Sequence, residues 1–156
     1  KLEKLDIDSC WSVTTLAPLS QLNNLLSINL SHCSSWDDLS PLSSLTNLLE
    51  INMLGCNSVT DLTPISSLIN LERINLDSSD KIFDLSPLNL CKSLKMIICR
   101  GLPRLRSIEP LRGLDQLSEL VTGLHPAATT EILAYSATQR RDFKYILDLR
   151  KTGLDF

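Results

Sequence analysis

Leucine recurs every 23 residues along most of this chain, and no insertion breaks the interval. It opens six consecutive segments, at Leu2, Leu25, Leu48, Leu71, Leu94 and Leu117. A fixed period of this length is the signature of a repeat array, in which each unit buries its apolar face only against its neighbours. The interval therefore predicts a solenoid rather than a globule with one central core.

The first part of each segment predicts a short strand. When the places are numbered 1 to 23 from the leucine, apolar residues hold places 4 and 6, as in Ile51 with Met53 and Ile74 with Leu76. Two-residue spacing points both members of a pair to one side of a strand and the odd places to the other side. We therefore expect one strand per segment, stacked into a parallel concave sheet.

The second part of each segment predicts a short helix. Ser40, Thr63 and Ser86 each precede a proline, and a hydroxyl before proline is typical of a helix start, where the side-chain oxygen accepts a backbone N–H. Asn47 and Asn70 close their segments, and asparagine tolerates the left-handed backbone that a turn requires. Each unit is expected to run strand, loop, short helix and turn, which is an α/β arrangement.

The combined pattern, LxxLxLxxC…LxPLxxLxN, resembles the leucine-rich repeat (LRR) superfamily. The stretches DLSPLSSLTNL and DLTPISSLINL are similar to the short-repeat class found in internalins and in the protein-phosphatase-1 regulatory subunit. The resemblance covers residues 2 to about 124. It implies a right-handed α/β solenoid over residues 1–125, with a concave sheet, short convex helical turns and protein binding as the common function. Place 9, often asparagine in that family, departs from it with Cys10, Cys33, Cys56, Ser79 and Leu102.

The period stops at Pro126, and residues 126–156 are expected to form a C-terminal helical cap, as one kinked helix or two short ones. Its apolar face would comprise Ile132, Leu133, Tyr135, Phe143, Ile146 and Leu149. The alternative is a partner-binding helix with the basic residues Arg140, Arg141, Lys144, Arg150 and Lys151. Because the chain begins inside a repeat, we expect it to be a fragment of a longer protein.

The composition predicts a folded protein in a reducing compartment. Apolar residues make up 43% and charged residues 21%, and no apolar run approaches the roughly 18 residues that span a bilayer. Cys10, Cys33 and Cys56 share place 9, which indicates small buried thiols, and we expect a cytoplasmic location. The sequon Asn29-Leu30-Ser31 leaves a secreted form as the alternative, although it lies on a predicted strand.

Chemistry-bearing residues do not gather at catalytic or metal-binding spacing. His32 and His125 have no nucleophile or carboxylate set near them, and the adjacent Asp37 and Asp38 suit a turn. Stacking places cysteines one per turn, so no metal site or other cofactor is expected. A net charge of −3 and 4% aromatic residues argue against nucleic acid as a partner. We predict no enzymatic activity, no small-molecule substrate and no membrane partner.

The odd places of the strands carry the candidate site, because their side chains stack into columns that face solvent or another protein. The candidates are Asn29, Glu50, Asn52, Leu54, Arg73, Asn75, Asp77, Met96, Ile98 and Arg100. They predict a polar floor with an apolar anchor at Leu54, Met96 and Ile98. Two alternatives remain open: the asparagines ladder to one another, and the terminal helix covers Met96, Ile98 and Val121.

Charge is distributed unevenly. Residues 1–78 hold three basic and nine acidic side chains, a net charge of −6, whereas residues 79–156 hold twelve and nine, a net charge of +3. A basic edge is predicted at Lys92, Lys95, Arg100, Arg104, Arg106 and Arg112. The alternatives to concave-face binding are therefore a structural subunit docked by this edge and the terminal helix, or a targeting module for an attached enzyme.

Overall fold

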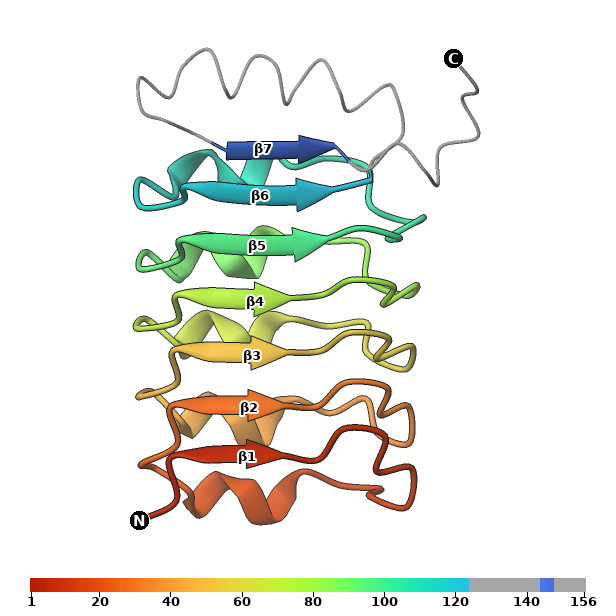
Figure 1. The fold of residues 1–156 in the computed structure, drawn as a ribbon, viewed down its shortest axis with the longest axis vertical. Helices are drawn as coiled ribbons and strands as arrows, with labels where there is room; N and C mark the ends of the chain where they lie inside the picture. The colour runs from red at the N-terminus through yellow and green to blue at the C-terminus, as the bar shows by residue number, and fades with distance from the viewer. Residues whose placement is uncertain (124–143, 148–156) are drawn as a thin grey trace.

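The computed structural model describes residues 1–123 and, for the backbone, residues 144–147. In this part of the chain seven parallel strands follow one another across a single sheet in sequence order (Figure 1). They are β1 (Lys4–Asp6), β2 (Ser27–Asn29), β3 (Glu50–Asn52), β4 (Arg73–Asn75), β5 (Met96–Cys99), β6 (Glu119–Thr122) and β7 (Lys144–Leu147). Ile28, Ile51 and Ile74 pair in register, so each turn advances by one repeat. The predicted parallel sheet is confirmed.

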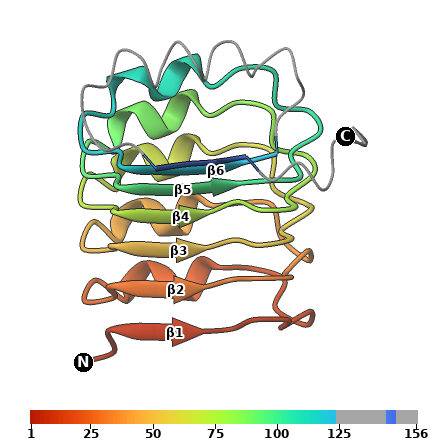
Figure 2. The ribbon, with the colours of Figure 1, turned by 45° about the horizontal axis from the view of Figure 1, so that its top comes forward.

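Within residues 1–123, five short 3-10 helices lie behind the sheet, all on the same side of it (Figures 1 and 2). They are η1 (Ala17–Gln21), η2 (Ser40–Ser44), η3 (Thr63–Ser67), η4 (Ser86–Leu90) and η5 (Glu109–Gly113). Each carries a proline in its first turn, where the missing N–H costs no hydrogen bond. The predicted short helices are therefore single tight turns.

The core is a column of leucine and isoleucine between the sheet and these helices. Leu25, Leu48, Leu71 and Leu94 at place 1 are 0% exposed. In the first turn the packing is incomplete, since Leu2 at the same place is 48% exposed and Leu5 is only partly buried. This difference follows from the solenoid itself, because the first turn of the structure packs against a neighbour on one side only.

The structure corrects the prediction of which side chains cap the helices. The hydroxyls of Ser40 and Thr63 do not cap their helices; instead the Oδ1 atoms of Asp38 and Asp61, two residues earlier, accept the N–H groups of Ser40 and Thr63 at 2.8 Å. The serine or threonine hydroxyl was predicted to take this role because it directly precedes proline. Carboxylates are preferred because an ionised oxygen is the stronger acceptor.

A second correction concerns the left-handed residues. Positive φ angles occur at place 8, in Ser9, His32, Gly55, Ser78 and Gly101, and not at the asparagines of place 23. Nδ2 of Asn47 donates to the carbonyl of Asn23 at 2.8 Å, and Nδ2 of Asn70 donates to that of Thr46 at 2.9 Å. These asparagines therefore tie each turn to the one before it, which a glycine-like turn residue could not do.

The tail differs from its prediction where the structure describes it. Residues 144–147 form strand β7, parallel to β6 with Leu120 opposite Tyr145 and Val121 opposite Ile146, so the predicted helix is wrong there. The outer edge of β6 offers unpaired backbone groups, and tyrosine and isoleucine favour a strand. The rest of the predicted cap, including Ile132, Leu133, Tyr135, Phe143, Leu149 and the basic residues Arg140, Arg141, Arg150 and Lys151, lies outside the described residues.

All five cysteines are free thiols, and the place-9 thiols have a structural role. Sγ of Cys33 donates to the carbonyl of Ile7 at 3.2 Å, and Sγ of Cys56 donates to that of Leu30 at 3.1 Å. Burial raises the pKa of the Cys56 thiol to about 12. Small donors at this inward corner therefore satisfy a carbonyl of the preceding turn. The predicted burial is confirmed for Cys33 and Cys56, whereas Cys10 is only partly buried.

Candidate functional site

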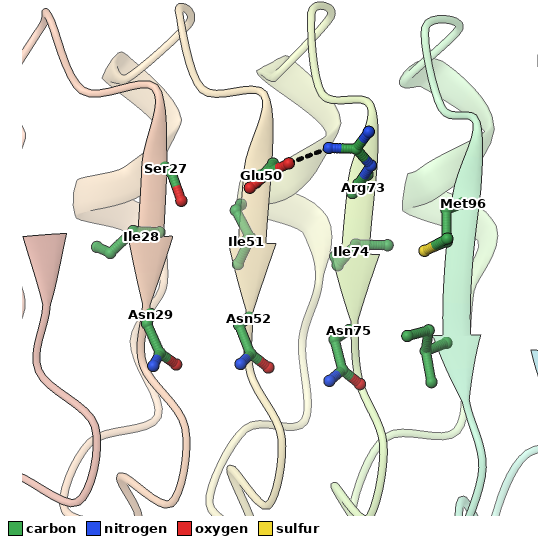
Figure 3. Close-up of a pocket in the computed structure, with 11 residues that line it drawn as sticks. Ser27, Ile28, Asn29, Glu50, Ile51, Asn52, Arg73, Ile74, Asn75 and Met96 are labelled. Carbon is green, nitrogen blue, oxygen red and sulfur yellow. Dashed lines mark hydrogen bonds and ion pairs between the residues drawn. The ribbon is translucent and has the colours of Figure 1, made fainter. Parts of the chain in front are cut away.

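The candidate residues lie on the face of the sheet that carries no helices, which we call the open face. It consists of the side chains at places 3, 5 and 7. Side chains of β2 to β5 line a groove on it, with Asn29, Asn52 and Asn75 in one row and Met96 on the last of these strands, opposite Arg73 (Figure 3). Parallel pairing at a constant register produces this row, because Asn29 lies opposite Asn52 and Asn52 opposite Asn75.

Each asparagine of the row is oriented by its own strand end. The Oδ1 atoms of Asn52 and Asn75 accept the N–H groups of Leu54 and Asp77, at 3.2 and 2.9 Å. A backbone N–H can only donate, so the oxygen must face it and the amide nitrogen must point away. In Figure 3 each amide nitrogen lies on the side nearer β1.

The amide nitrogens of the three asparagines differ in their hydrogen bonding. Nδ2 of Asn29 donates to Oδ1 of Asp6 at 3.1 Å, whereas those of Asn52 and Asn75 make no hydrogen bond with residues 1–123. Within residues 1–123 the asparagines of the row bond to their own strand ends and to Asp6 rather than to one another, so the alternative of an asparagine ladder is wrong there. Asn52 and Asn75 present donors to the groove.

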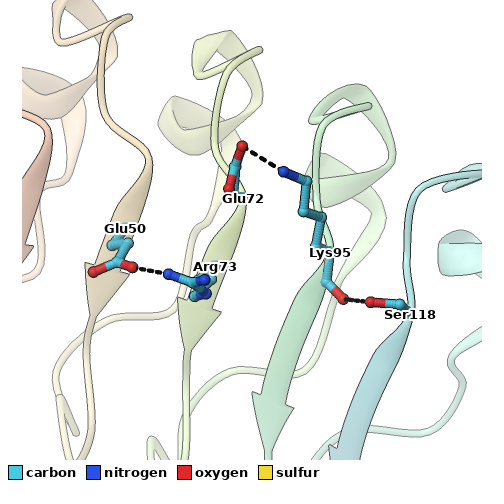
Figure 4. A network of polar contacts seen from close by, with 5 residues as sticks. All are labelled: Glu50, Glu72, Arg73, Lys95 and Ser118. Carbon is cyan, nitrogen blue, oxygen red and sulfur yellow. Dashed lines mark hydrogen bonds and ion pairs between the residues drawn. The ribbon is translucent and has the colours of Figure 1, made fainter. Parts of the chain in front are cut away.

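Ion pairs neutralise the charges beside the row. Arg73 Nη1 contacts Glu50 Oε1, and their side chains are 54% and 43% exposed. One place away on neighbouring strands, Lys95 Nζ lies 2.6 Å from Glu72 Oε1 (Figure 4). Exposed pairs contribute less than about 1 kcal/mol each. Their main effect is to leave the centre of the open face without net charge.

The last charged candidates form a more buried pair. Arg100 Nη2 lies 2.7 Å from Asp77 Oδ2, and the Asp77 side chain is only 9% exposed. Asp77 is therefore largely covered, and its accessible partner in the pair is Arg100, with a 36% exposed side chain. Sequence alternation places both residues on the open face, but it does not reveal that one lies beneath the other.

The structure divides the predicted apolar anchor. Met96 and Ile98 share strand β5 and are partly buried, and Val121 lies opposite Ile98 in the pairing with β6. Leu54 follows β3, so β4 separates it from the other two. The anchor thus consists of Met96 and Ile98, and the proposed cover by a terminal helix falls outside the described residues.

Asp6 and Asp8 also occupy outward places, 5 and 7 of the first segment, but they are not among the predicted site residues. Both are exposed, and Asp6 Oδ1 accepts the Asp8 N–H at 2.9 Å in addition to the Asn29 amide. They extend the asparagine row to β1 and end it in negative charge. The signal was present, since Asp6 occupies the same place as the asparagines.

Solved structures give an independent comparison with this geometry. An internalin, InlF, from Listeria monocytogenes superimposes with a TM-score of 0.69 and 25% sequence identity, over 85% of this chain and 37% of the other. This chain is a leucine-rich-repeat protein. A second internalin from that organism, InlC2, is similar in fold, with a TM-score of 0.51 and 23% identity over 70% of this chain and 57% of the other.

The LRR protein spans 37% of the length of the first internalin and 57% of the second. No protein-family model matches its sequence. No curated protein matches it either. The predicted resemblance to the superfamily is confirmed at the level of fold.

The basic edge of the LRR protein is largely engaged within the chain. Lys92 Nζ donates to Asn89 Oδ1 at 3.0 Å and to the Gly113 carbonyl at 2.9 Å, and Arg112 pairs with Glu109 at 2.8 Å. Lys95 and Arg100 are paired as described above. Docking an acidic partner through these four side chains would compete with these contacts.

Other chemistry is sparse in the described part of the LRR protein. Residues 1–123 contain no cluster of three histidine, cysteine or acidic side chains that could hold a metal ion. His32 is exposed at a turn, His125 lies outside the described residues, and Asp38 serves a helix start. In the same part of the chain, no helix has the length and apolar character needed to cross a membrane.

Proposed function

We propose that this LRR protein is a non-catalytic module that binds another protein through the open face of its sheet. The observation that carries the proposal is the groove across β2 to β5, where the Asn52 and Asn75 amides present donors next to Met96 and Ile98. Solenoids of stacked repeats offer extended surfaces of this kind for partners. Polar groups around an apolar anchor suit a protein interface.

The test compares partner capture by two double variants with that of the wild type. Asn52→Arg with Asn75→Glu places long charged side chains in the groove, and it should abolish capture of a specific partner in a quantitative pull-down. The matched control, Thr46→Arg with Ile69→Glu, makes the same charge changes at exposed positions that follow the helices η2 and η3. Circular dichroism first establishes that all three proteins fold. Equal losses in both variants, or none in the groove variant, would refute open-face binding.

We also propose a reducing, cytoplasmic location. The five free cysteines support this proposal, because four of them are buried as thiols within the core. Subcellular fractionation of the natural protein tests it, and recovery in an oxidising compartment would overturn it.

A further inference from the structure

We infer that the open face recognises an extended peptide segment with a basic residue about six residues from a large apolar one. This inference rests on the proposed function and specifies the partner. It concerns the side chains at place 5 from β1 to β5, together with Asp8 beside Asp6, which we call the recognition row. Asp77 and Arg100, at place 7, pair with each other and are not part of it. The row begins with carboxylates, continues with amides and ends at an apolar side chain.

The β1 end of the recognition row attracts a cation. Asp6 and Asp8 are both exposed, and the bonds from the Asp8 N–H and the Asn29 amide occupy only one of the two carboxylate oxygens of Asp6. Lys4, the other charged side chain on this face of the first turn, lies at place 3 and outside the row. The row therefore starts with two negative charges, which complement a lysine or arginine.

The centre of the recognition row presents hydrogen-bond donors, so it favours a partner with neutral acceptors there. The amide nitrogens of Asn52 and Asn75 point into the groove with no partner in residues 1–123, and the Glu50 and Arg73 charges neutralise each other. A folded surface has few backbone carbonyls to offer, because secondary structure already uses them. An extended segment keeps its carbonyls free. The paired donors thus favour a peptide over a folded domain.

The spacing of the two ends sets the length of the segment. The apolar end, Ile98 with Met96 beside it, lies on β5, four strands from β1. Four steps of about 4.8 Å span about 19 Å, which an extended chain covers in about six residues. The basic side chain and the apolar side chain should therefore be separated by five or six positions.

The experiment uses a phage library of random dodecapeptides, selected on the whole chain and counter-selected on the Asn52→Arg, Asn75→Glu variant. Enriched sequences should carry lysine or arginine five or six positions from leucine, isoleucine, methionine or phenylalanine, in one consistent order. The best sequence is then synthesised, together with a copy in which glutamate replaces the basic residue, and both are titrated by fluorescence anisotropy.

Reversing the charge of Asp6 and Asp8 tests whether the β1 end of the row binds the basic side chain of the peptide. Asp6→Lys with Asp8→Lys should weaken the basic peptide about tenfold and strengthen the glutamate copy. Asp37→Lys with Asp80→Lys changes the charge by the same amount at exposed loop positions and should leave the preference unchanged. Ile98→Ala should weaken both peptides without altering the salt dependence.

The outcomes separate the inference from the proposed function. Enriched peptides without the spacing, or a preference that Asp6→Lys with Asp8→Lys leaves unchanged, would overturn the inference. If the groove variant nevertheless loses its natural partner, open-face binding stands and that partner is a folded surface. If neither peptides nor the natural partner depend on the groove residues, both proposals fail.

Discussion

At the scale of single residues, short polar side chains organise the backbone of every turn. Asp38 and Asp61 accept the first helical N–H groups, and Asn52 and Asn75 close the strand ends in the same way. Asparagine and aspartate suit both jobs, because their side chains bond the backbone two residues further along the chain. At the strand ends this leaves a free amide nitrogen, so a local structural bond also creates a surface donor.

We predict a pH dependence from the aspartates at the helix starts. Hydrogen bonds from the Ser40 N–H and hydroxyl lower the pKa of Asp38, and those from the Thr63 hydroxyl and N–H lower the pKa of Asp61. A carboxylate with a lowered folded pKa stabilises the protein above its unfolded pKa, and this contribution is lost as the pH falls through the folded pKa. Asp38→Asn with Asp61→Asn should therefore lose less stability below about pH 4 than the wild type does.

Urea unfolding at pH 7, 4 and 3 measures this difference. Because asparagine keeps the acceptor oxygen, the double variant should be only slightly less stable at pH 7. The exposed neighbour Asp37 provides the control, and Asp37→Asn should follow the wild-type curve. Parallel curves for the wild type and the double variant would show that these bonds do not change strength with pH.

At the scale of the elements, the sequence predicted the features that recur in every repeat. Alternation at places 4 and 6 gave the strands and their inward side chains, as Ile51 and Ile74 show. The left-handed corner was missed because histidine, serine and glycine share place 8 without a common signal. Strand β7 was missed because its pairing partner Tyr145 lies 25 residues after Leu120, outside the period.

The candidate site was predictable in its columns but not in its pairings. Alternation alone puts Asn52, Asn75, Arg73 and Asp77 on the open face. Whether a charged side chain remains available depends on its rotamer and on the neighbouring strand, as the buried Asp77 paired with Arg100 shows. One-dimensional patterns contain no such information.

The corner at Gly55 supports a prediction at this scale. Gly55 has a φ of +69°, and a Cβ there would lie 2.7 Å from Nδ1 of His32 in the preceding turn. Gly55→Ala should therefore destabilise the protein by about 2 kcal/mol, from left-handed strain together with the clash. In a double-mutant cycle, His32→Ala should recover about half of this loss, measured by urea unfolding.

Gly101→Ala is the matched control for this cycle. Gly101 has a φ of 63°, and Ser78 rather than histidine holds place 8 in the turn before it. Its substitution should show the strain without the coupling to His32. Equal losses at both glycines, with no coupling to His32, would mean that the imidazole moves aside freely.

At the scale of the whole molecule, the stability of each turn depends on the turns that pack against it. Each inner turn packs against its two neighbours, and the strands pair in chain order. A solenoid of this kind is stabilised mainly by nearest-neighbour interfaces, so its ends open first. At the C-terminal end, β7 supplies a neighbour for β6, and at the other end β1 has β2 on one side only.

This arrangement predicts the effect of removing the last strand. A chain that ends at residue 123 leaves the edge of β6 unpaired, and the amides of Glu119–Thr122 should exchange hydrogen at least about tenfold faster, while those of β3 change little. Replacing Lys144–Leu147 by Gly-Ser-Gly-Ser in the whole chain should reproduce the loss, because it removes strand propensity and leaves the other residues in place. Exchange measured by mass spectrometry on peptides from β3 and β6 distinguishes the cases. If β6 remains as protected in both variants as in the wild type, the pairing with β7 does not stabilise the end of the solenoid.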